Sequence, residues 1–279
     1  MAILASVLPS GSELLKPGMR EERLLNTLRV RRRCLLQSAG CMKSRLEPFG
    51  PDLNPAPRRR LLAAFDVDGT LTTLRDSWRF YHEALGTWAE ASRNAERFFR
   101  GELSYEEWAR LDVGLWRGVP LDRLVGLAKG VPWREGAFRL AGLKREGYVL
   151  YASTTGVSLI ARRAVEELGF DGYVANEVEV AEGRLTGGVV VRVEYGGKGE
   201  ALRRLRKEVG AELVVAVGDG PPDVGMFEEA DVAIALEPTG PDVARAADVV
   251  IERGGLNAVV DFLQALPSCL KGSTARRRS

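Results

Sequence analysis

Leu-Leu-Ala-Ala-Phe-Asp-Val-Asp-Gly-Thr, residues 61–70, is the stretch that decides the fold. Its first half is an apolar run without a polar interruption, which is typical of a strand buried on both faces of a parallel sheet. The run ends at two carboxylates, Asp66 and Asp68, and the glycine after them permits a tight turn. Two carboxylates at this spacing can divide their work, because one can attack an electrophile while the other transfers a proton.

Further apolar runs follow along the chain. Like the first, they are short, continuous and rich in Val, Leu and Ala, and they occupy 148–152, 213–217, 232–236 and 249–251. Helical patterns lie between them, as in Ser158–Leu168 and Lys198–Val209. Strands and helices in alternation predict an α/β fold, with a Rossmann-like, doubly wound and mostly parallel sheet as its core.

Two stretches depart from this alternation. Residues 76–135 contain no strand-like run but carry many aromatic residues in amphipathic patterns, which predicts an inserted helical cap with its own small core. Residues 178–193 alternate between apolar and polar around a turn at 181–184, which predicts a small β-hairpin. The α/β core is therefore expected to comprise 61–75 and 136–267.

Charge is distributed unevenly along the chain. Residues 1–60 carry 12 Lys or Arg against 5 Asp or Glu, and 268–279 add four basic residues, whereas 61–267 hold 24 basic against 33 acidic residues. The acidic core argues against nucleic acid as the main ligand, because a phosphate backbone needs a positive surface. We expect the basic extension 1–60 to be disordered. It could instead result from a start codon assigned upstream of the true one, which would lie near Met42. We expect the basic tail 268–279 to be disordered as well. A basic arm for nucleic acid or an acidic partner is the alternative.

All three cysteines, Cys34, Cys41 and Cys269, lie in these two tails and show no metal-type spacing. This distribution favours a reducing, cytoplasmic setting. The apolar start at 1–8 is too short to span a bilayer, so no membrane association is expected. The sequence gives no indication of the oligomeric state.

Three more polar clusters lie where predicted strands end or predicted helices begin. Ser-Thr-Thr-Gly at 153–156 offers hydroxyls and, at a helix start, backbone N–H groups that suit a phosphate. Lys198 opens a predicted helix and is placed to neutralise a phosphoryl group. Asp219 and Asp223, in Gly-Asp-Gly-Pro-Pro-Asp, suit a hard divalent cation. Each cluster alone fits an ordinary turn, helix cap or surface, but together they mark the sheet edge where ligands bind in α/β folds.

In this order, over about residues 61–266, the four clusters resemble the haloacid dehalogenase superfamily of phosphohydrolases. The resemblance implies that Asp66 is a nucleophile that forms an aspartyl-phosphate. It also implies that Asp68 protonates the leaving alcohol and then activates the hydrolytic water. The phosphoryl oxygens would be held by Thr154, Thr155 and Lys198.

The same resemblance implies Mg²⁺ as the cofactor. An anionic nucleophile repels an anionic ester, so a divalent cation and a lysine are needed to offset both charges. The ion would lie between the Asp66 carboxylate, the Asp68 backbone carbonyl and Asp219, with Asp223 supporting its waters or Lys198.

The position of the cap is similar to that in phosphoserine phosphatases. Thr154 lies 86 positions after Asp68, which leaves room for a helical cap. Lys198 lies 44 positions after Thr154, which is too few for the large α/β cap of some other members.

The residues that would contact the leaving group depart from that subgroup. Its members hold the amino group of serine with a Glu and the carboxylate with an Arg, where this chain has Arg75 and Asp112, with Arg110 nearby. Pro222 also replaces the Asn that is usual in the last motif. We interpret these reversals as a leaving group other than serine, with Arg75 favouring an anionic or polyhydroxyl substrate. The alternative is that the alignment of the cap is offset by a residue or two, so that Arg110 or Arg117 serves as the carboxylate-binding Arg.

The sequence therefore predicts a Mg²⁺-dependent phosphatase that acts on small-molecule phosphomonoesters. One alternative is a phosphomutase or phosphotransferase of the same superfamily, which would share Asp66 and Asp68. Another is a non-enzymatic binding protein that retains the site. The lone histidine, His82, follows cap aromatics and is expected to pack rather than to catalyse.

Overall fold

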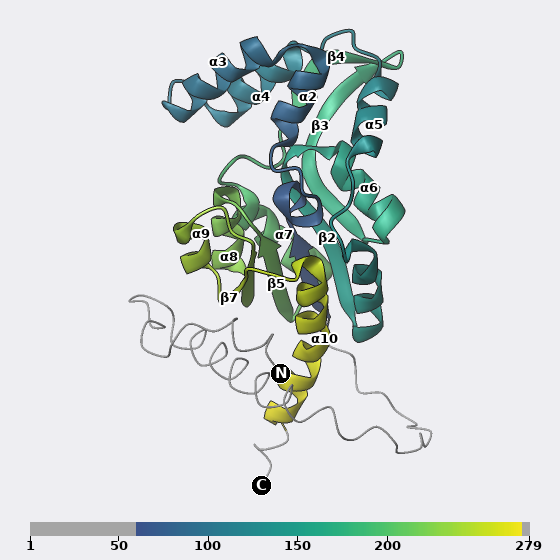
Figure 1. Ribbon diagram of the computed structural model, residues 1–279, viewed down its shortest axis with the longest axis vertical. Coiled ribbons are helices and arrows are strands. Elements are labelled where there is room, and N and C mark those ends of the chain that lie inside the picture. Colours follow the sequence, from purple (N-terminus) through teal and green to yellow (C-terminus); the bar gives the residue numbers. More distant parts are fainter. Residues whose placement is uncertain (1–59, 275–279) are drawn as a thin grey trace.

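A computed structural model describes residues 60–274 of the chain, and their side chains as far as Pro267 (Figure 1). The predictions for the extension 1–60 and the tail 268–279 therefore fall almost entirely outside the described residues. No helix within 60–274 combines the length and the apolar character needed to cross a bilayer.

The core is a seven-stranded sheet in which β1 (Leu61–Phe65) is the central strand. Neighbouring strands are parallel, except that β4 runs antiparallel to β3. Across the sheet the order is β4 (Arg184–Val190), β3 (Gly172–Ala181), β2 (Tyr148–Val157), β1, β5 (Leu213–Gly218), β6 (Val232–Leu236) and β7 (Val249–Ile251). The predicted α/β, doubly wound and mostly parallel fold is confirmed.

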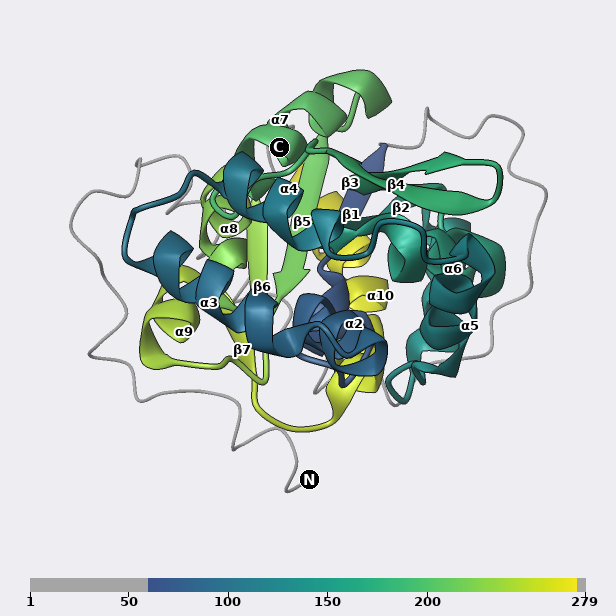
Figure 2. The ribbon, with the colours of Figure 1, turned by 90° about the horizontal axis from the view of Figure 1, so that it is seen from above.

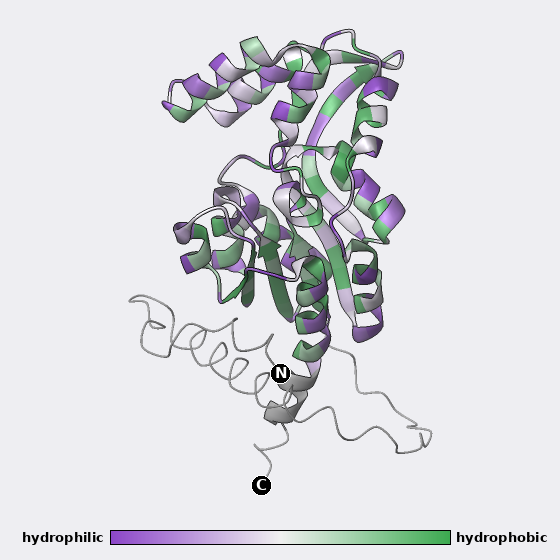
Figure 3. Cartoon of the chain, in the orientation of Figure 1, coloured by the Kyte–Doolittle hydropathy of each residue, from purple (hydrophilic) through white to green (hydrophobic). Residues whose placement is uncertain are grey.

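The side chains of the central strand belong to two separate hydrophobic cores, because successive side chains of a strand point to opposite faces of the sheet. Leu61, Ala63 and Phe65 belong to one buried cluster, and Leu62 and Ala64 belong to the other. The second cluster is covered by α7 (Lys198–Val209), α8 (Val224–Glu229) and α9 (Pro241–Ala246). The first is covered by η2 (Ala137–Glu146), α6 (Ser158–Leu168) and α10 (Gly255–Thr274). Figure 3 shows the apolar colouring concentrated on the strands between these layers.

The aromatic-rich stretch forms helices, as the sequence predicts. These are α2 (Ser77–Leu85), α3 (Trp88–Phe99), α4 (Tyr105–Gly114) and α5 (Leu121–Gly130). Their interior is aromatic: Trp78 lies between Trp108 and Trp116, with ring centroids 5.6 and 5.7 Å away. Figures 1 and 2 place α3 and α4 beyond the end of the sheet, whereas α5 lies beside α6. The division of the chain into a core and a cap domain at 76 and 135 stays a prediction.

The predicted hairpin is present, but it belongs to the main sheet. Ala181 pairs with Arg184 across a turn, and β3 begins at Gly172, where it pairs in parallel with β2. Both turn residues, Glu182 and Gly183, have positive φ of 51° and 72°, which is the geometry of a tight hairpin turn. The hairpin therefore extends the sheet at its edge rather than forming a separate element.

Candidate active site

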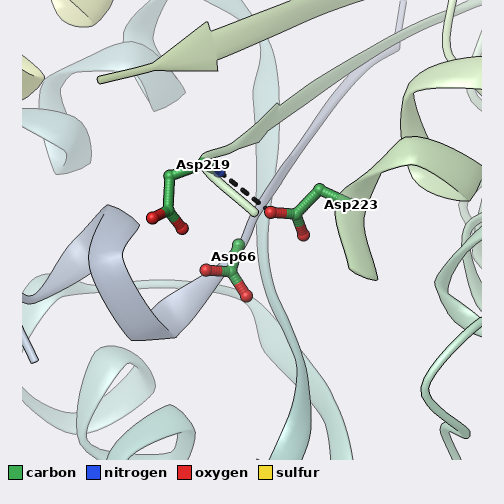
Figure 4. A group of neighbouring side chains, drawn as sticks. All are labelled: Asp66, Asp219 and Asp223. Carbon is green, nitrogen blue, oxygen red and sulfur yellow. Dashed lines mark hydrogen bonds between the residues drawn. The ribbon is translucent and has the colours of Figure 1, made fainter. Parts of the chain in front are cut away.

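Three carboxylates converge at the carboxyl ends of two neighbouring strands. Asp66 follows β1, Asp219 follows β5, and Asp223 ends a short helical turn, η3 (Pro221–Asp223). Because β1 and β5 are parallel neighbours with Phe65 paired to Val217, their ends meet at the same edge. One oxygen from each carboxylate lies within 4.8 Å of the others, and Figure 4 shows the three groups facing a common point.

A lysine from α7 joins this cluster. The Lys198 side chain is 1% exposed, and its Nζ donates to Asp66 and, at 2.7 Å, to Asp223 Oδ1. Burial alone would lower the pKa of Lys198, but the carboxylates of Asp223 and Asp66 outweigh that effect and raise it. Lys198 is therefore a charged group fixed beside Asp66, and the alternative of a solvated surface lysine is excluded.

The acids carry more negative charge than Lys198 balances. Burial first, and then repulsion from Asp223, raise the pKa of Asp66 well above its ordinary value, although Lys198 opposes the shift. The same two causes raise the pKa of Asp219 to about 7. Clustered carboxylates of this kind supply the hard oxygen ligands that Mg²⁺ takes, and a divalent cation would relieve their repulsion. The residues present thus fit a bound Mg²⁺, with Asp66, Asp219 and Asp223 around it.

Gly69 lets the turn after β1 approach this cluster. Its φ is +81°, and a Cβ at this position would lie 2.3 Å from Asp219 Oδ2. Any side chain would therefore displace a predicted metal ligand. This explains in physical terms why glycine follows the second carboxylate of the opening motif.

Asp68 has one engaged and one free oxygen. Its Oδ2 accepts a hydrogen bond from the Ser77 backbone N–H at 2.8 Å, at the start of α2, whereas its Oδ1 is buried without a partner among the described residues. Burial raises the pKa of Asp68 to about 6. This carboxyl can therefore exchange a proton near neutral pH, as a general acid and base must.

The threonine cluster lies inside β2 rather than after it. The strand continues five residues beyond its predicted end, to Val157, and α6 begins directly at Ser158, so the expected helix-opening cradle at 153–156 is wrong. A register shift against β3 between Ser153 and Val157 accompanies this extension. Thr154 Oγ1 accepts from the Gly156 N–H at 2.9 Å, and Thr154 and Thr155 both line the pocket of the site.

That pocket has a volume of about 270 Å³ and contains most of the predicted site residues. Arg75 lies in it, with a guanidinium nitrogen 2.7 Å from Asp219 Oδ2. Asp112 also lines it, but its carboxylate is bound to Asn94 and lies 3.2 Å from the buried His82 ring. Arg110 does not line it, since it pairs with Glu106 on the surface.

Two residues of the site carried no assignable role in the sequence. Arg134 donates to the carbonyl oxygen of Gly69 at 2.6 Å and pairs with Glu237 at 2.7 Å, so it positions the turn that follows β1. Asn176 is fully buried, and its side-chain amide joins the Thr155 carbonyl to the backbone of Arg192 and Val193 ahead of α7. A single Arg or Asn outside the four polar clusters carries no distinguishing signal in the sequence.

Comparisons with known proteins agree with this geometry. The model of the haloacid dehalogenase-like hydrolase family matches residues 63–228. A phosphoserine phosphatase of Methanocaldococcus jannaschii is 31% identical over 211 residues, which are 74% of this chain and 99% of that protein. A phosphoserine phosphatase of Halobacterium salinarum is 34% identical over 205 residues, which are 72% and 97% of the two chains. A solved structure described as a phospho-aspartyl intermediate analogue of phosphoserine phosphatase has a TM-score of 0.63 at 30% identity, covering 73% of this chain and 99% of its own.

Proposed function

The chain belongs to the haloacid dehalogenase-like hydrolases and is a phosphatase among them, and from this premise we propose that it hydrolyses small-molecule phosphomonoesters with Mg²⁺ through an aspartyl-phosphate. One observation carries the proposal: Asp66, at the end of the central strand, is held by the buried Lys198 while Asp219 and Asp223 face it. We also propose that the protein acts in the cytoplasm, because the distribution of its cysteines favours a reducing setting.

The chemistry follows from the positions of the side chains. The Asp66 carboxylate attacks phosphorus and forms an acyl phosphate as the bond to the alcohol oxygen breaks. Asp68 gives its proton to that oxygen, then takes a proton from the water that attacks the acyl phosphate and releases inorganic phosphate. Lys198, Thr154 and Thr155 hold the phosphoryl oxygens. Mg²⁺, when bound, supplies the positive charge that lets two anions meet.

The leaving alcohol is proposed to be something other than serine. Asp112 stands where a carboxylate-binding Arg is expected, and it is committed to Asn94 and His82. Arg75 stands where an ammonium-binding Glu is expected, and its charge is directed at Asp219, at the phosphate end of the pocket. At each of these two positions the charge is therefore opposite to the one that the subgroup uses to bind phosphoserine, and the side chain already has a partner within the protein. A clear preference for phosphoserine over sugar phosphates, glycerol phosphates and nucleotides would overturn this part.

The test is release of inorganic phosphate from a panel of phosphomonoesters, with Mg²⁺ and with a chelator. We expect hydrolysis that requires Mg²⁺ and that Asp66→Asn abolishes. Asp261→Asn, a change on the exposed surface, is the matched control and should keep full activity. A phosphomutase would instead return the phosphoryl group to its substrate without net phosphate release, and a binding protein would turn over no ester at all.

A further inference from the structure

The residues of α3 that line the pocket are all apolar. Trp88, Ala95 and Phe99 are spaced by seven and four positions, which places them on the same face of a helix, and all three line the pocket. Phe99 is 66% exposed, which is unusual for so large an apolar side chain. Exposed apolar surface at the rim of a polar site is typical of a binding groove.

Aromatic side chains also form the facing walls of the pocket. Trp108, from α4, stacks on Phe98 at 4.9 Å and is nearly buried, so its indole is held rigidly. Tyr195, from the segment before α7, meets the edge of Phe99 with ring centroids 5.8 Å apart. Trp78, which belongs to α2, lies beside Trp108. The pocket is therefore lined by aromatic rings from several elements of the fold.

The charged side chains that line the pocket outside the cluster of Asp66, Lys198 and Asp223 already have partners within the described residues. The pairs are Arg75 with Asp219, Arg79 with Glu83, Asp76 with the backbone N–H of Arg79, and Asp112 with Asn94. Arg79 also lies over the Trp88 ring, 5.1 Å from its centroid. These contacts already offset the charges, and a ring can pack against the aromatic side chains without competing for them.

One polar group of the pocket lining lacks a partner. Trp108 Nε1 is buried and makes no hydrogen bond to any described residue, although its indole lines the pocket. A buried N–H without an acceptor is costly. Because this atom is closed to solvent, a ligand atom would reach it only as the side chains around it adapt, and a hydrogen bond made there would recover that cost.

From these features we propose that the leaving alcohol carries a planar ring with a hydrogen-bond acceptor, so that the substrate is a ring-bearing alkyl phosphate. The ring contacts the apolar face of α3, and the acceptor receives the hydrogen bond of Trp108 Nε1. This inference rests on the proposed function, and it replaces an unspecified alcohol with a chemical class.

The experiment uses pairs of esters that share a primary alkyl phosphate and differ in the ring. Propyl phosphate, phenylpropyl phosphate and pyridylpropyl phosphate are compared with phosphoserine by kcat/KM on the full chain. We expect the phenyl ester to exceed the propyl ester by about tenfold or more, as burial of such a group in an apolar pocket gives. The pyridyl ester, which adds the acceptor, should be better still.

Variants locate the preference on the residues named. Phe99→Ala should lower kcat/KM far more for the phenyl ester than for propyl phosphate, and so remove most of the advantage that the ring gives. Trp108→Phe should equalise the pyridyl and phenyl esters. Phe138→Ala is the matched control, since Phe138 is 67% exposed and does not line the pocket, and it should change neither comparison.

Binding separates the two proposals. The corresponding propyl- and phenylpropylphosphonates, which cannot be hydrolysed, are titrated by calorimetry. Tighter binding of the phenyl compound without hydrolysis of any ester would overturn the phosphatase and support the ligand class. Hydrolysis without a preference for the ring would overturn the proposed ligand class. The same conclusion would follow if Phe99→Ala altered the oligomeric state but left the preference for the ring intact.

Discussion

At the scale of single residues, the reactivity of Asp66 is set by its neighbours. Burial and the facing acids oppose its ionisation, and Lys198 favours it. Positive charge added at the cluster would therefore favour the ionised form of Asp66, which is the nucleophile. This balance depends on oxygen atoms held within 4.8 Å of one another, so a small displacement of Asp219 has a direct chemical consequence.

Gly69→Ala tests that dependence. The new Cβ would meet Asp219 Oδ2 at 2.3 Å, and φ of +81° is strained for alanine. We expect a loss of about 1–2 kcal/mol in the free energy of unfolding and a roughly 10–100-fold rise in the Mg²⁺ concentration that half-saturates activity.

Gly86→Ala is its control. Gly86 has a similar φ of +76°, but nothing lies within 4 Å of the Cβ that alanine would add. It should share the loss of stability and keep the Mg²⁺ requirement. Equal Mg²⁺ requirements in the two variants would show that Asp219 is not a ligand held by this close approach.

At the scale of elements, α5 is fastened to α6 by one arginine. Arg163, on α6, donates to the carbonyls of Ala128 and, at 2.9 Å, Val131 at the end of α5, and forms a two-pronged pair with Glu167. Glu167 also accepts from the Trp133 indole at 2.7 Å. This clasp connects the last helix of the insert to the layer that covers the sheet.

The clasp predicts a pH dependence of stability. The hydrogen bond from Arg163, with that from Trp133, lowers the pKa of Glu167 below its ordinary value of 4.5. A lowered pKa in the folded state stabilises the fold above pH 4.5, and that stabilisation is lost as the pH falls through the folded pKa. Since the pair is partly exposed, Glu167→Gln should cost about 0.5–1 kcal/mol near neutral pH and almost nothing in strong acid.

Denaturant unfolding at the two pH values measures this difference. Glu166→Gln, on the exposed neighbouring position, should cost little at either pH. A cost for Glu167→Gln that does not change with pH would mean that packing, rather than charge, accounts for the contact.

The limits of sequence reasoning are clearest at this scale. Continuous apolar runs located β1, β6 and β7 to the residue, because buried strands have few alternatives. The polar residues 153–156 concealed the last part of β2, since strand pairing with β3 overrides their preference for a turn or cap. The order of the motifs predicted that Asp66, Lys198 and Asp219 lie in one site, and the structure brings these three residues together. The burial of Lys198 and the contact of Arg75 with Asp219 could not be predicted, because they depend on packing between segments far apart in the sequence.

At the scale of the whole molecule, the site residues are confined to the acidic, folded part of the chain. The described pocket is lined by residues from Asp66 to Thr239, and β1 begins at Leu61. All of these residues lie within the part of the chain that the structure describes. An enzyme whose activity resides in this part can be distinguished by experiment from a protein that acts through the arginines of its extension.

Deleting residues 1–57 tests which description holds. We expect kcat and KM for the preferred ester to change by no more than roughly twofold, because the lining residues of the described pocket are all retained. Nucleic-acid binding that falls steeply with salt and disappears with the deletion would support the basic-arm alternative. Loss of ester hydrolysis in the shortened chain would contradict the confinement of activity to the α/β core.

The most direct test of the account is to trap the covalent intermediate. The protein is mixed with a preferred ester and Mg²⁺, quenched in acid and treated with borohydride, which reduces an acyl phosphate to an alcohol. Peptide mass spectrometry should find homoserine at position 66 in the wild type and none in Asp66→Asn. Modification at another carboxylate, or rapid phosphate release with no trapped residue and full activity in Asp66→Asn, would contradict the assignment of Asp66 as nucleophile.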